Sequence, residues 1–449
     1  MYIIRIKIDR LVYGYILFAS IASVAIFPVI LEPLDNDVFY HMVVARDMVE
    51  NNRLIAKETW FDSPGGLLQF RYPPIFHWLL ALLSLDGAID FEKIAVVLQV
   101  IFYPLALVSS YILVSNIKDK QTGLVAIILL SLYFPFFGRT HMAIPEALQH
   151  SLIPLTFLFY LKNKVKLAGF MMSIMLANHV FDAIFCLFTI LGHWFLYRRA
   201  TFNVLFFLLL SLPGIIFQVY GVYGFLALNS IKNMSSVYDF ATSVSSNYSR
   251  MFLGIACPSI ILTLGIWSLR KDTLCKDSIL LVIWFFFLIL IFLKLPNRFP
   301  GYAGLPLAFF AATGIRKVFE KKSPRYEYYL SIIAGLMIAN IYWSYQFFPH
   351  VYDFYKPGAD KKQRQALLYI RDNLPSKEVI QVNPGRSFYE GYRIVYFTRH
   401  NSTETAGKAK YLYSVLPDEP SGEWSVLKIY GKHKIYMRSS KGFADGVGN

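Results

Sequence analysis

The feature that most constrains this chain is a succession of apolar runs joined by short loops that carry lysine and arginine. A helix needs about 20 apolar residues to cross the hydrocarbon core of a bilayer, and eleven runs reach or approach that length. Hydrophobic residues make up 56% of the 449 residues, above the roughly 45–50% of ordinary soluble domains. The sequence therefore predicts a polytopic α-helical membrane protein with about eleven spans. The expected spans are 11–31, 94–115, 121–137, 147–161, 167–179, 183–197, 202–223, 251–269, 278–294, 299–315 and 327–347.

The basic residues predict the orientation of these spans, because cytoplasmic loops carry an excess of lysine and arginine. If the N-terminus is cytoplasmic, every inner loop is basic. The net charge of +15 is then explained by membrane orientation. Nucleic-acid binding is not expected, because no continuous basic stripe with interleaved aromatic residues is present. The inner loops are 116–120, 162–166, 198–199, 270–276 and 316–325.

The opposite face of a cell membrane or an ER-type membrane receives the long loop 32–93 and the C-terminal tail. Within the loop, 37–51 has the apolar spacing of an amphipathic helix. The segment 73–85 is too short to span comfortably and is expected to lie along the outer leaflet. The segment 1–10, with Arg5, Lys7 and Arg10, resembles the start of a signal peptide. No small-residue cleavage site follows before Glu32, so a retained first helix is expected.

The composition becomes that of a soluble module near residue 352. We expect two domains: a transmembrane domain at 1–350 that includes the long outer loop, and an extracytoplasmic α+β domain at 351–449. The three cysteines are far apart in sequence, which indicates neither a disulfide framework nor a CxxC metal site. In the second domain a helix is expected at 360–373 and strands at 378–382, 393–398, 409–415, 424–430 and 434–438.

Asp35 and Asp37 follow the first apolar run directly. Two carboxylates so close together at a membrane surface can bind a divalent cation, or one can act as a general base while the other tunes it. The alternative is that both are solvated charges at the N-terminus of the next helix, where anions are favoured.

Three further outer turns carry candidate residues. Glu146 follows Pro145 between two expected spans, where a charge must reach water or a partner, although an acid at a helix start needs no function. His179 and Asp182 mark a turn that either is structural or lines a substrate. Arg298 at the outer end of a span can clamp phosphate or can be a snorkelling surface arginine.

The first outer loop contains Asp35-Asn36-Asp37 through His41 and Arg46, then Asn51-Asn52, Trp60-Phe61-Asp62, and Arg71-Tyr72-Pro73-Pro74 through His77-Trp78. Together these segments resemble the first outer loop of the catalytic subunit of oligosaccharyltransferase, a member of the GT-C superfamily of polyprenyl-phosphate-sugar-dependent glycosyltransferases. The turn from Gly138 to Glu146 is similar to that family's second acidic motif, and the turn at Arg298 looks like its late arginine.

The chain also departs from the family pattern. It contains no Trp-Trp pair, whereas members that glycosylate asparagine hold the acceptor with a Trp-Trp-Asp motif. The late outer loop 224–250 has only Asp239 as an acid, where a glutamate is expected. Leu148 stands at the second carboxylate position of the acidic motif. These differences bear on the acceptor and leave the donor chemistry untouched.

The resemblance implies a GT-C-like membrane glycosyltransferase whose reaction inverts the configuration at the anomeric carbon of the sugar. It would transfer a sugar or glycan from a polyprenyl (dolichyl) phosphate or pyrophosphate to a protein or glycolipid acceptor on the extracytoplasmic face. A divalent metal, Mg or Mn, is an allowed cofactor. The implied catalytic residues and metal ligands are Asp37, Asp35 and Glu146; the donor phosphate would be bound by Arg298 and Arg139, and the substrate would be lined by His41, Arg46, Tyr72 and His179.

Three alternatives remain open at this stage. The chain could be a single-subunit oligosaccharyltransferase that acts on asparagine, which the missing acceptor motif disfavours. It could be a transporter or lipid flippase, in which polar residues and broken helices also occur. Against this, the carboxylates lie on the outer face and no repeat relates the two halves. It could also be a non-catalytic subunit with a degenerate site.

Overall fold

The structure is a computed structural model, and its described residues form two compact units. Unit 1 comprises Met1–Leu31 and Val97–Asp353, and unit 2 comprises Glu32–Val96 and Phe354–Asn449. The expected division into domains 1–350 and 351–449 stays a prediction. The described residues are 8–26, 37–52, 54, 61–62, 74–197, 202–216, 275–292, 299–320, 361–376, 378–382, 387–403, 409–415 and 424–438.

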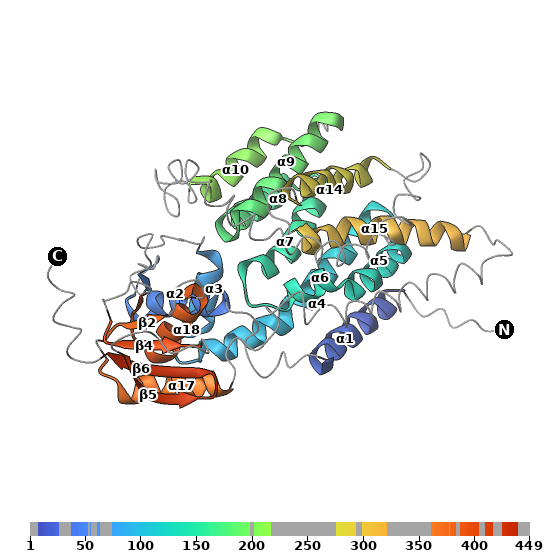
Figure 1. Cartoon of the computed structure of the whole chain (residues 1–449). Helices are drawn as coiled ribbons and strands as arrows, with labels where there is room; N and C mark the ends of the chain where they lie inside the picture. The colour runs from blue at the N-terminus through green and yellow to red at the C-terminus, as the bar shows by residue number, and fades with distance from the viewer. Residues whose placement is uncertain are drawn as a thin grey trace. The chain divides into compact units, whose positions relative to one another are not determined.

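Unit 1 is helical throughout its described part (Figure 1). Its helices overlap the expected spans that are described, except that 121–137 is divided between two helices. The expected spans 251–269 and 327–347 lie outside the described residues. The helices are α1 Ile8–Ile26, α4 Phe91–Ile117, whose first turn belongs to unit 2, α5 Lys120–Leu132, α6 Phe134–Thr140, α7 Pro145–Leu161, α8 Val165–Asn178, α9 Val180–Tyr197, α10 Val204–Ile216, the short 3₁₀ helix η2 Lys276–Ser278, α14 Ile279–Phe292 and α15 Phe299–Glu320.

Among the described residues, α4 is the one helix that is both long and apolar enough to cross a membrane. Five shorter apolar helices accompany it, so the count of eleven spans is not confirmed. One expected span, 121–137, is divided. Tyr133 is extended between α5 and α6, and Pro135 lies in the first turn of α6, where its missing amide hydrogen costs no helical hydrogen bond.

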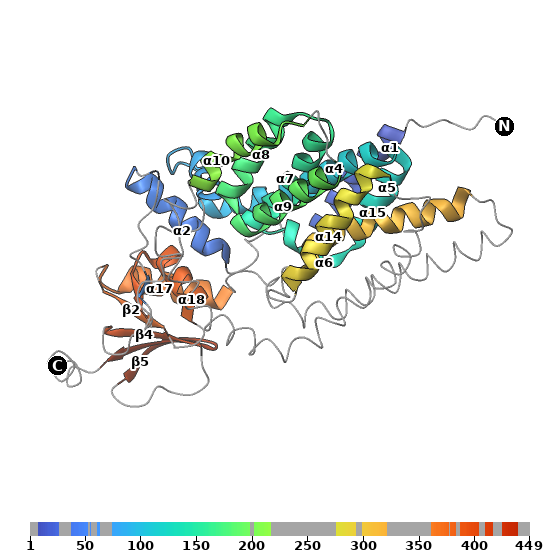
Figure 2. The ribbon, with the colours of Figure 1, turned by 90° about the horizontal axis from the view of Figure 1, so that it is seen from above.

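Close helix packing in unit 1 depends on small residues. Helix α8 lies alongside α10 in both Figure 1 and Figure 2. A Cβ added to Gly214 of α10 would come within 2.4 Å of the carbonyl oxygen of Ser173 in α8. The hydroxyl of Ser173 also accepts a hydrogen bond from the amide of Gly214 at 2.9 Å. This is the small-residue contact by which apolar helices approach one another in a membrane.

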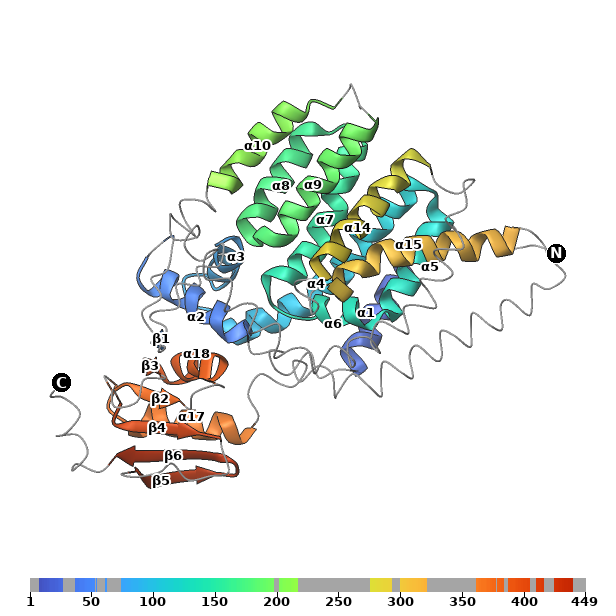
Figure 3. The same ribbon diagram turned by 45° about the horizontal axis from the view of Figure 1, so that its top comes forward.

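Unit 2 combines helices with a six-stranded sheet of order β1-β3-β2-β4-β6-β5 (Figure 3). The strands β1, β3, β2 and β4 are mutually parallel, and β6 is antiparallel to both β4 and β5. Helix α17 packs on β5 and β6, and α18 packs on β1, β2 and β3. The elements are α2 Asp37–Glu50, β1 Phe61–Asp62, α3 Ile75–Leu83, α17 Lys361–Asn373, β2 Ile380–Val382, α18 Ser387–Thr398, β3 Ser402–Thr403, β4 Tyr411–Ser414, β5 Trp424–Tyr430 and β6 His433–Arg438.

The predicted α+β character of the C-terminal segment is confirmed, with one wrong element. The segment 393–398 was expected to be a strand because Ile, Val, Tyr and Phe favour strands, but it is the second half of helix α18. The helix buries Ile394 and Val395 and packs against α2. Tertiary burial therefore overrides local propensity here.

The segment 32–93, expected from the sequence to be an outer loop, contributes directly to the sheet of unit 2. Strand β1 comes from this loop and pairs with β3, so that Phe61 lies opposite Ser402. Helix α2 packs on α18 and on α3. The loop and the C-terminal segment thus share one core.

Candidate active site

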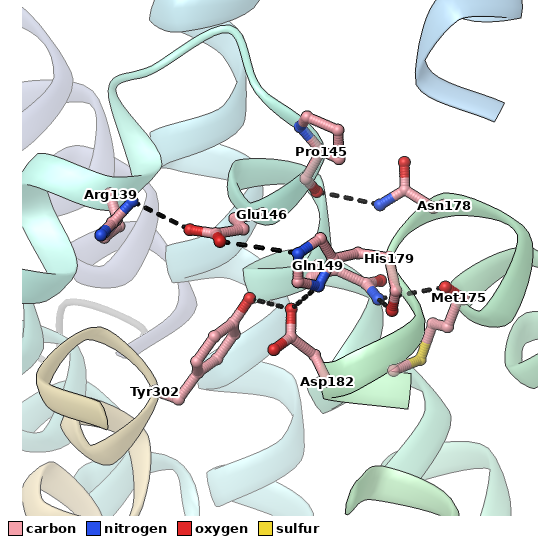
Figure 4. Close-up of polar contacts among 9 residues, drawn as sticks. All are labelled: Arg139, Pro145, Glu146, Gln149, Met175, Asn178, His179, Asp182 and Tyr302. Atoms are coloured by element: carbon pink, nitrogen blue, oxygen red, sulfur yellow. Dashed lines mark hydrogen bonds and ion pairs between the residues drawn. The ribbon is translucent and has the colours of Figure 1, made fainter. Parts of the chain in front are cut away.

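Arg139 and Glu146 face each other across the turn between α6 and α7 (Figure 4). Pro145 begins α7, which places Glu146 in its first turn, where the free amide groups of a helix favour a negative charge. Nη1 of Arg139 donates to Oε2 of Glu146 at 2.9 Å. The Glu146 side chain is only 8% exposed, and this guanidinium compensates its charge.

His179 links Glu146 to a second carboxylate. The residue is the C-cap of α8, with an extended backbone, and α9 begins immediately after it. Its Nε2 lies 3.5 Å from Oε1 of Glu146, and its Nδ1 lies 2.6 Å from Oδ2 of Asp182 in the first turn of α9. One imidazole therefore faces a buried carboxylate through each of its ring nitrogens.

Helix α15 closes this group of side chains. The hydroxyl of Tyr302 donates to Oδ2 of Asp182, and the Tyr302 ring stacks on the imidazole of His150, with centroids 4.4 Å apart. The preceding Gly301 allows the approach, since a Cβ there would lie 3.2 Å from Cγ of Arg139 and 3.4 Å from Nε2 of His150. Nε2 of His150 is buried and has no hydrogen-bond partner among the described residues.

Two amide side chains hold the backbone beneath these residues. Nε2 of Gln149 in α7 donates to the carbonyl oxygens of His179 at 2.9 Å and Met175 at 3.2 Å, which lie at the C-terminal end of α8. In return, Nδ2 of Asn178 donates to the carbonyl oxygen of Pro145 at 2.9 Å. The ends of α7 and α8 are thereby locked together, as Figure 4 shows.

The resulting group, Arg139, Glu146, His179, Asp182 and Tyr302, is called the Glu146 cluster below. An imidazole between two carboxylates can carry a proton from one to the other. Arg139 and Tyr302 stand at the two ends and stabilise negative charge on the carboxylate that each contacts. The cluster can therefore accept a proton from a bound group, because each charged side chain in it keeps a partner of opposite charge or a hydrogen-bond donor inside the apolar helix bundle.

The Glu146 cluster does not fit a metal ion. Both of its carboxylates are held by an arginine, a histidine or a tyrosine, and in the described part of the chain no three His, Cys, Asp or Glu side chains are placed to share an ion. Of the expected ligands, Asp37 belongs to unit 2, and Asp35 lies outside the described residues. We therefore derive no step through a metal.

Unit 2 holds three of the other expected site residues. Asp37 is the first residue of α2 and is half-buried. His41 is buried, with its Nδ1 2.8 Å from Nε2 of His77; burial lowers the pKa of His77 to about 3. Arg46 donates to the carbonyl oxygens of Val395 and Tyr396 at 2.9 and 2.7 Å, and its burial lowers its pKa.

Arg46 therefore binds the C-terminal end of α18, where the carbonyl of Val395 also accepts from the amide of Arg399 at 3.1 Å. The remaining expected site residues, Asp35, Tyr72 and Arg298, lie outside the described residues. The pattern at Gly138–Glu146 and the turn at His179 and Asp182 were visible in the sequence. Tyr302, His150 and Gln149 were missed because nothing in their local sequence distinguishes them from residues that simply fill an apolar helix.

No protein-family model and no curated protein sequence matches the chain. Solved structures, however, resemble the chain in fold. The archaeal oligosaccharyltransferase AglB from Archaeoglobus fulgidus, in complex with an inhibitory peptide and a dolichol-phosphate, is 13% identical, with a TM-score of 0.62 over 90% of this chain and 69% of that chain. ArnT from Cupriavidus metallidurans, bound to undecaprenyl phosphate, is 11% identical, with a TM-score of 0.61 over 97% of this chain and 98% of that chain.

The chain has the GT-C fold. The resemblance seen in the sequence is thus confirmed at the level of structure. It extends well beyond the first 160 residues, since the likeness to ArnT covers nearly the whole chain. A further structure of the A. fulgidus oligosaccharyltransferase, in complex with Zn and sulfate, is 16% identical and has a TM-score of 0.60 over 89% of this chain and 67% of that chain.

Proposed function

We propose that this GT-C protein is a membrane glycosyltransferase that moves a sugar or glycan from a polyprenyl (dolichyl) phosphate or pyrophosphate to an acceptor on the extracytoplasmic face. The observation that carries the proposal is the buried Glu146 cluster in a chain whose fold is that of AglB and ArnT. Structures of both neighbours hold a polyprenyl phosphate, which supports a donor of this class.

The reaction needs a base for the acceptor and charge stabilisation for the leaving group. A carboxylate takes the proton of the acceptor, whose oxygen or nitrogen then bonds to the anomeric carbon of the sugar. The bond from that carbon to the phosphate oxygen breaks, and its electron pair leaves with the phosphate. We assign Asp37 as the acid nearest the reacting centre, supported by Asp35 and Glu146.

Arg139 and Arg298 are assigned to the phosphate. Arg139 is bound to Glu146 through Nη1, and a guanidinium has five N–H donors, so one arginine can hold the carboxylate and also bind phosphate oxygens. Stabilising the departing charge in this way commonly supplies a large part of catalysis. The buried Nε2 of His150 lies beside the same arginine, near Gly301, and is a further hydrogen-bonding group for the donor.

The experiment that tests this function is a transfer assay on the full chain in lipid vesicles. The donors are polyprenyl phosphate monosaccharides and polyprenyl pyrophosphate oligosaccharides, labelled in the sugar, and the acceptors are a sequon peptide and a glycolipid extract. We expect transfer from at least one donor, and a fall of about 10²- to 10⁴-fold in Asp37→Asn. Asp47→Asn on the same helix, α2, is the matched control and should retain activity.

The same assay separates the alternatives. Transfer to the sequon peptide would identify an oligosaccharyltransferase. Because the chain lacks the Trp-Trp-Asp motif, other residues would then hold the acceptor. Full activity in a correctly inserted Asp37→Asn variant would remove Asp37 from the mechanism. If intact donor lipid moves across the vesicle membrane and no label is transferred from any donor, the protein is a lipid flippase and not a glycosyltransferase.

A further inference from the structure

Unit 2 contains a cavity of about 460 Å³ that is formed entirely by its own residues. Its volume is in the range of about 300–1,000 Å³ that small-ligand sites occupy. The walls come from the second half of α2, the turn before α4, the face of α17 and the end of α18. We call it the α2–α17–α18 pocket.

The charged residues of the pocket have both signs, and two pairs of them form ion pairs within the lining. Arg364 donates to Glu92 at 2.9 Å, and Arg399 lies 3.2 Å from Glu50 at the exposed rim. Arg46 is satisfied by the two carbonyls of α18 described above. Arg371, also in the lining, pairs with its exposed neighbour Asp372, which is not part of the lining.

This balance argues against a charged ligand. An anion would meet three carboxylates in the walls, those of Glu50, Asp90 and Glu92, which would repel it. A cation would meet four arginines. An apolar chain would remove all these groups from water without replacing their hydrogen bonds, which is costly.

A neutral ligand rich in hydroxyl groups meets neither objection. Each hydroxyl donates one hydrogen bond and accepts two, so it can bridge a guanidinium and its carboxylate without separating them. Tyr396 supplies a phenol, whose pKa is raised by burial and which therefore stays a donor; its hydroxyl faces Oδ1 of Asp90 at 3.5 Å. Tyr396, Phe397 and Phe91 add aromatic carbon to the lining, and the guanidinium groups of Arg46 and Arg364 lie over the rings of Tyr396 and Phe397, so the wall has apolar as well as polar surface for the C–H groups of a sugar ring.

We propose that the α2–α17–α18 pocket binds pyranose units of a glycan. The proposal rests on the glycosyltransferase function in that it names a ligand class for such an enzyme, but the binding itself requires no donor and no turnover. It concerns residues of α17, α18 and the turn before α4 that the transfer mechanism does not use.

Binding is measured on the full chain in lipid nanodiscs, because glycoside detergents would compete for the pocket. The probes are mannose, glucose, galactose and N-acetylglucosamine as methyl glycosides and as disaccharides, and saturation-transfer NMR detects binding. We expect at least one disaccharide to bind and Leu368→Trp to weaken it by about tenfold or more, because Leu368 lines the pocket. Gln365→Trp, exposed on the same helix and outside the lining, is the matched control and should bind as wild type does.

A second variant guards against a folding defect. Asp90→Asn keeps the oxygen that accepts from the amide of Glu92 at 2.7 Å and removes one charge from the pocket wall. It should also weaken saccharide binding. Absence of binding by every saccharide, binding that Leu368→Trp leaves unchanged, or displacement of the bound saccharide by inorganic phosphate or an acidic peptide would overturn the proposal. Saccharide binding without any glycosyl transfer would count against the proposed function alone.

Discussion

Asp182 and Tyr302 determine how His179 meets Glu146. Asp182 faces Nδ1 of the imidazole, which directs the other nitrogen toward Glu146, and Tyr302 holds Asp182 in place. Partners of this kind fix the orientation and tautomer of a functional histidine. We therefore expect both to act on transfer by positioning His179 beside Glu146.

Asp182→Asn should lower kcat/KM for transfer by about 10- to 100-fold, the usual cost of losing such a partner. Tyr302→Phe removes one hydrogen bond to a charged group and should cost about tenfold. Both variants should also shift the pH profile of kcat/KM. Tyr160→Phe, which loses a buried hydroxyl hydrogen-bonded to His193 at 2.8 Å, is the control; an equal shift in that variant would show that the effect is one of packing.

The buried pair His41 and His77 predicts a pH dependence of the stability of unit 2. The pKa of His77 falls from 6.5 to about 3 on folding because burial disfavours the charged imidazole. The unfolded chain therefore binds a proton that the folded chain does not. This stability is complete above pH 6.5 and is lost as the pH falls from 6.5 toward 3, at about 1.4 kcal/mol per pH unit.

Hydrogen exchange of the α2 and α3 amides between pH 7 and pH 5, corrected for intrinsic exchange, measures this loss. His77→Gln keeps a hydrogen-bonding group beside His41 and removes the titration, so its protection should fall much less with pH. Equal pH dependence in the variant and in wild type would contradict the assignment to His77.

Individual residues of the site were predictable only where they belong to a local pattern. Arg139, Glu146 and His179 stand in turns between apolar runs. A charged side chain there must reach water or a partner, so such residues can be singled out from the sequence. Tyr302 lies 120 residues from its partner Asp182, in a helix whose sequence indicates packing only. Tertiary contacts of this range leave no mark on spacing or composition.

Among the helices, the contact of α8 with α10 offers a direct test of packing. Gly214→Ala should destabilise unit 1 by about 1–3 kcal/mol, because the new methyl group would overlap the backbone of Ser173. Gly14→Ala in α1 is the control, since nothing lies within 4 Å of its added Cβ. The midpoint of thermal unfolding should fall for the first variant only; an equal change in both would mean that the α8–α10 contact is not close.

Helices were predicted well from the sequence because long apolar runs and the 3.6-residue period of 37–51 are strong signals. The hairpin strands β5 and β6 were also predicted closely. The second half of α18 was not, because its β-branched and aromatic residues favour strands and only its burial against α2 decides for helix. The break at Tyr133 was missed although Pro135, two residues later, is typical of the first turn of a new helix.

For the molecule as a whole, unit 2 requires both of its chain segments. Strand β1 extends the sheet, Arg46 binds the end of α18, and Glu92 binds Arg364 of α17. We expect a fragment of residues 351–449 to remain poorly folded alone and to fold when residues 32–96 are joined to it by a flexible linker. Near-ultraviolet circular dichroism compares the two fragments. A native-like spectrum from 351–449 alone would show that the loop adds nothing to its core.

The most direct test of the central claim is the release of sugar from a polyprenyl-phosphate-linked donor by the purified full chain in lipid vesicles. The glycosyltransferase account predicts that wild type consumes the donor and that Glu146→Gln is slower by about 10²- to 10⁴-fold. Glu378→Gln, outside the Glu146 cluster, should keep the wild-type rate. Equal donor consumption by wild type and Glu146→Gln, or none by wild type with any polyprenyl donor, would contradict it.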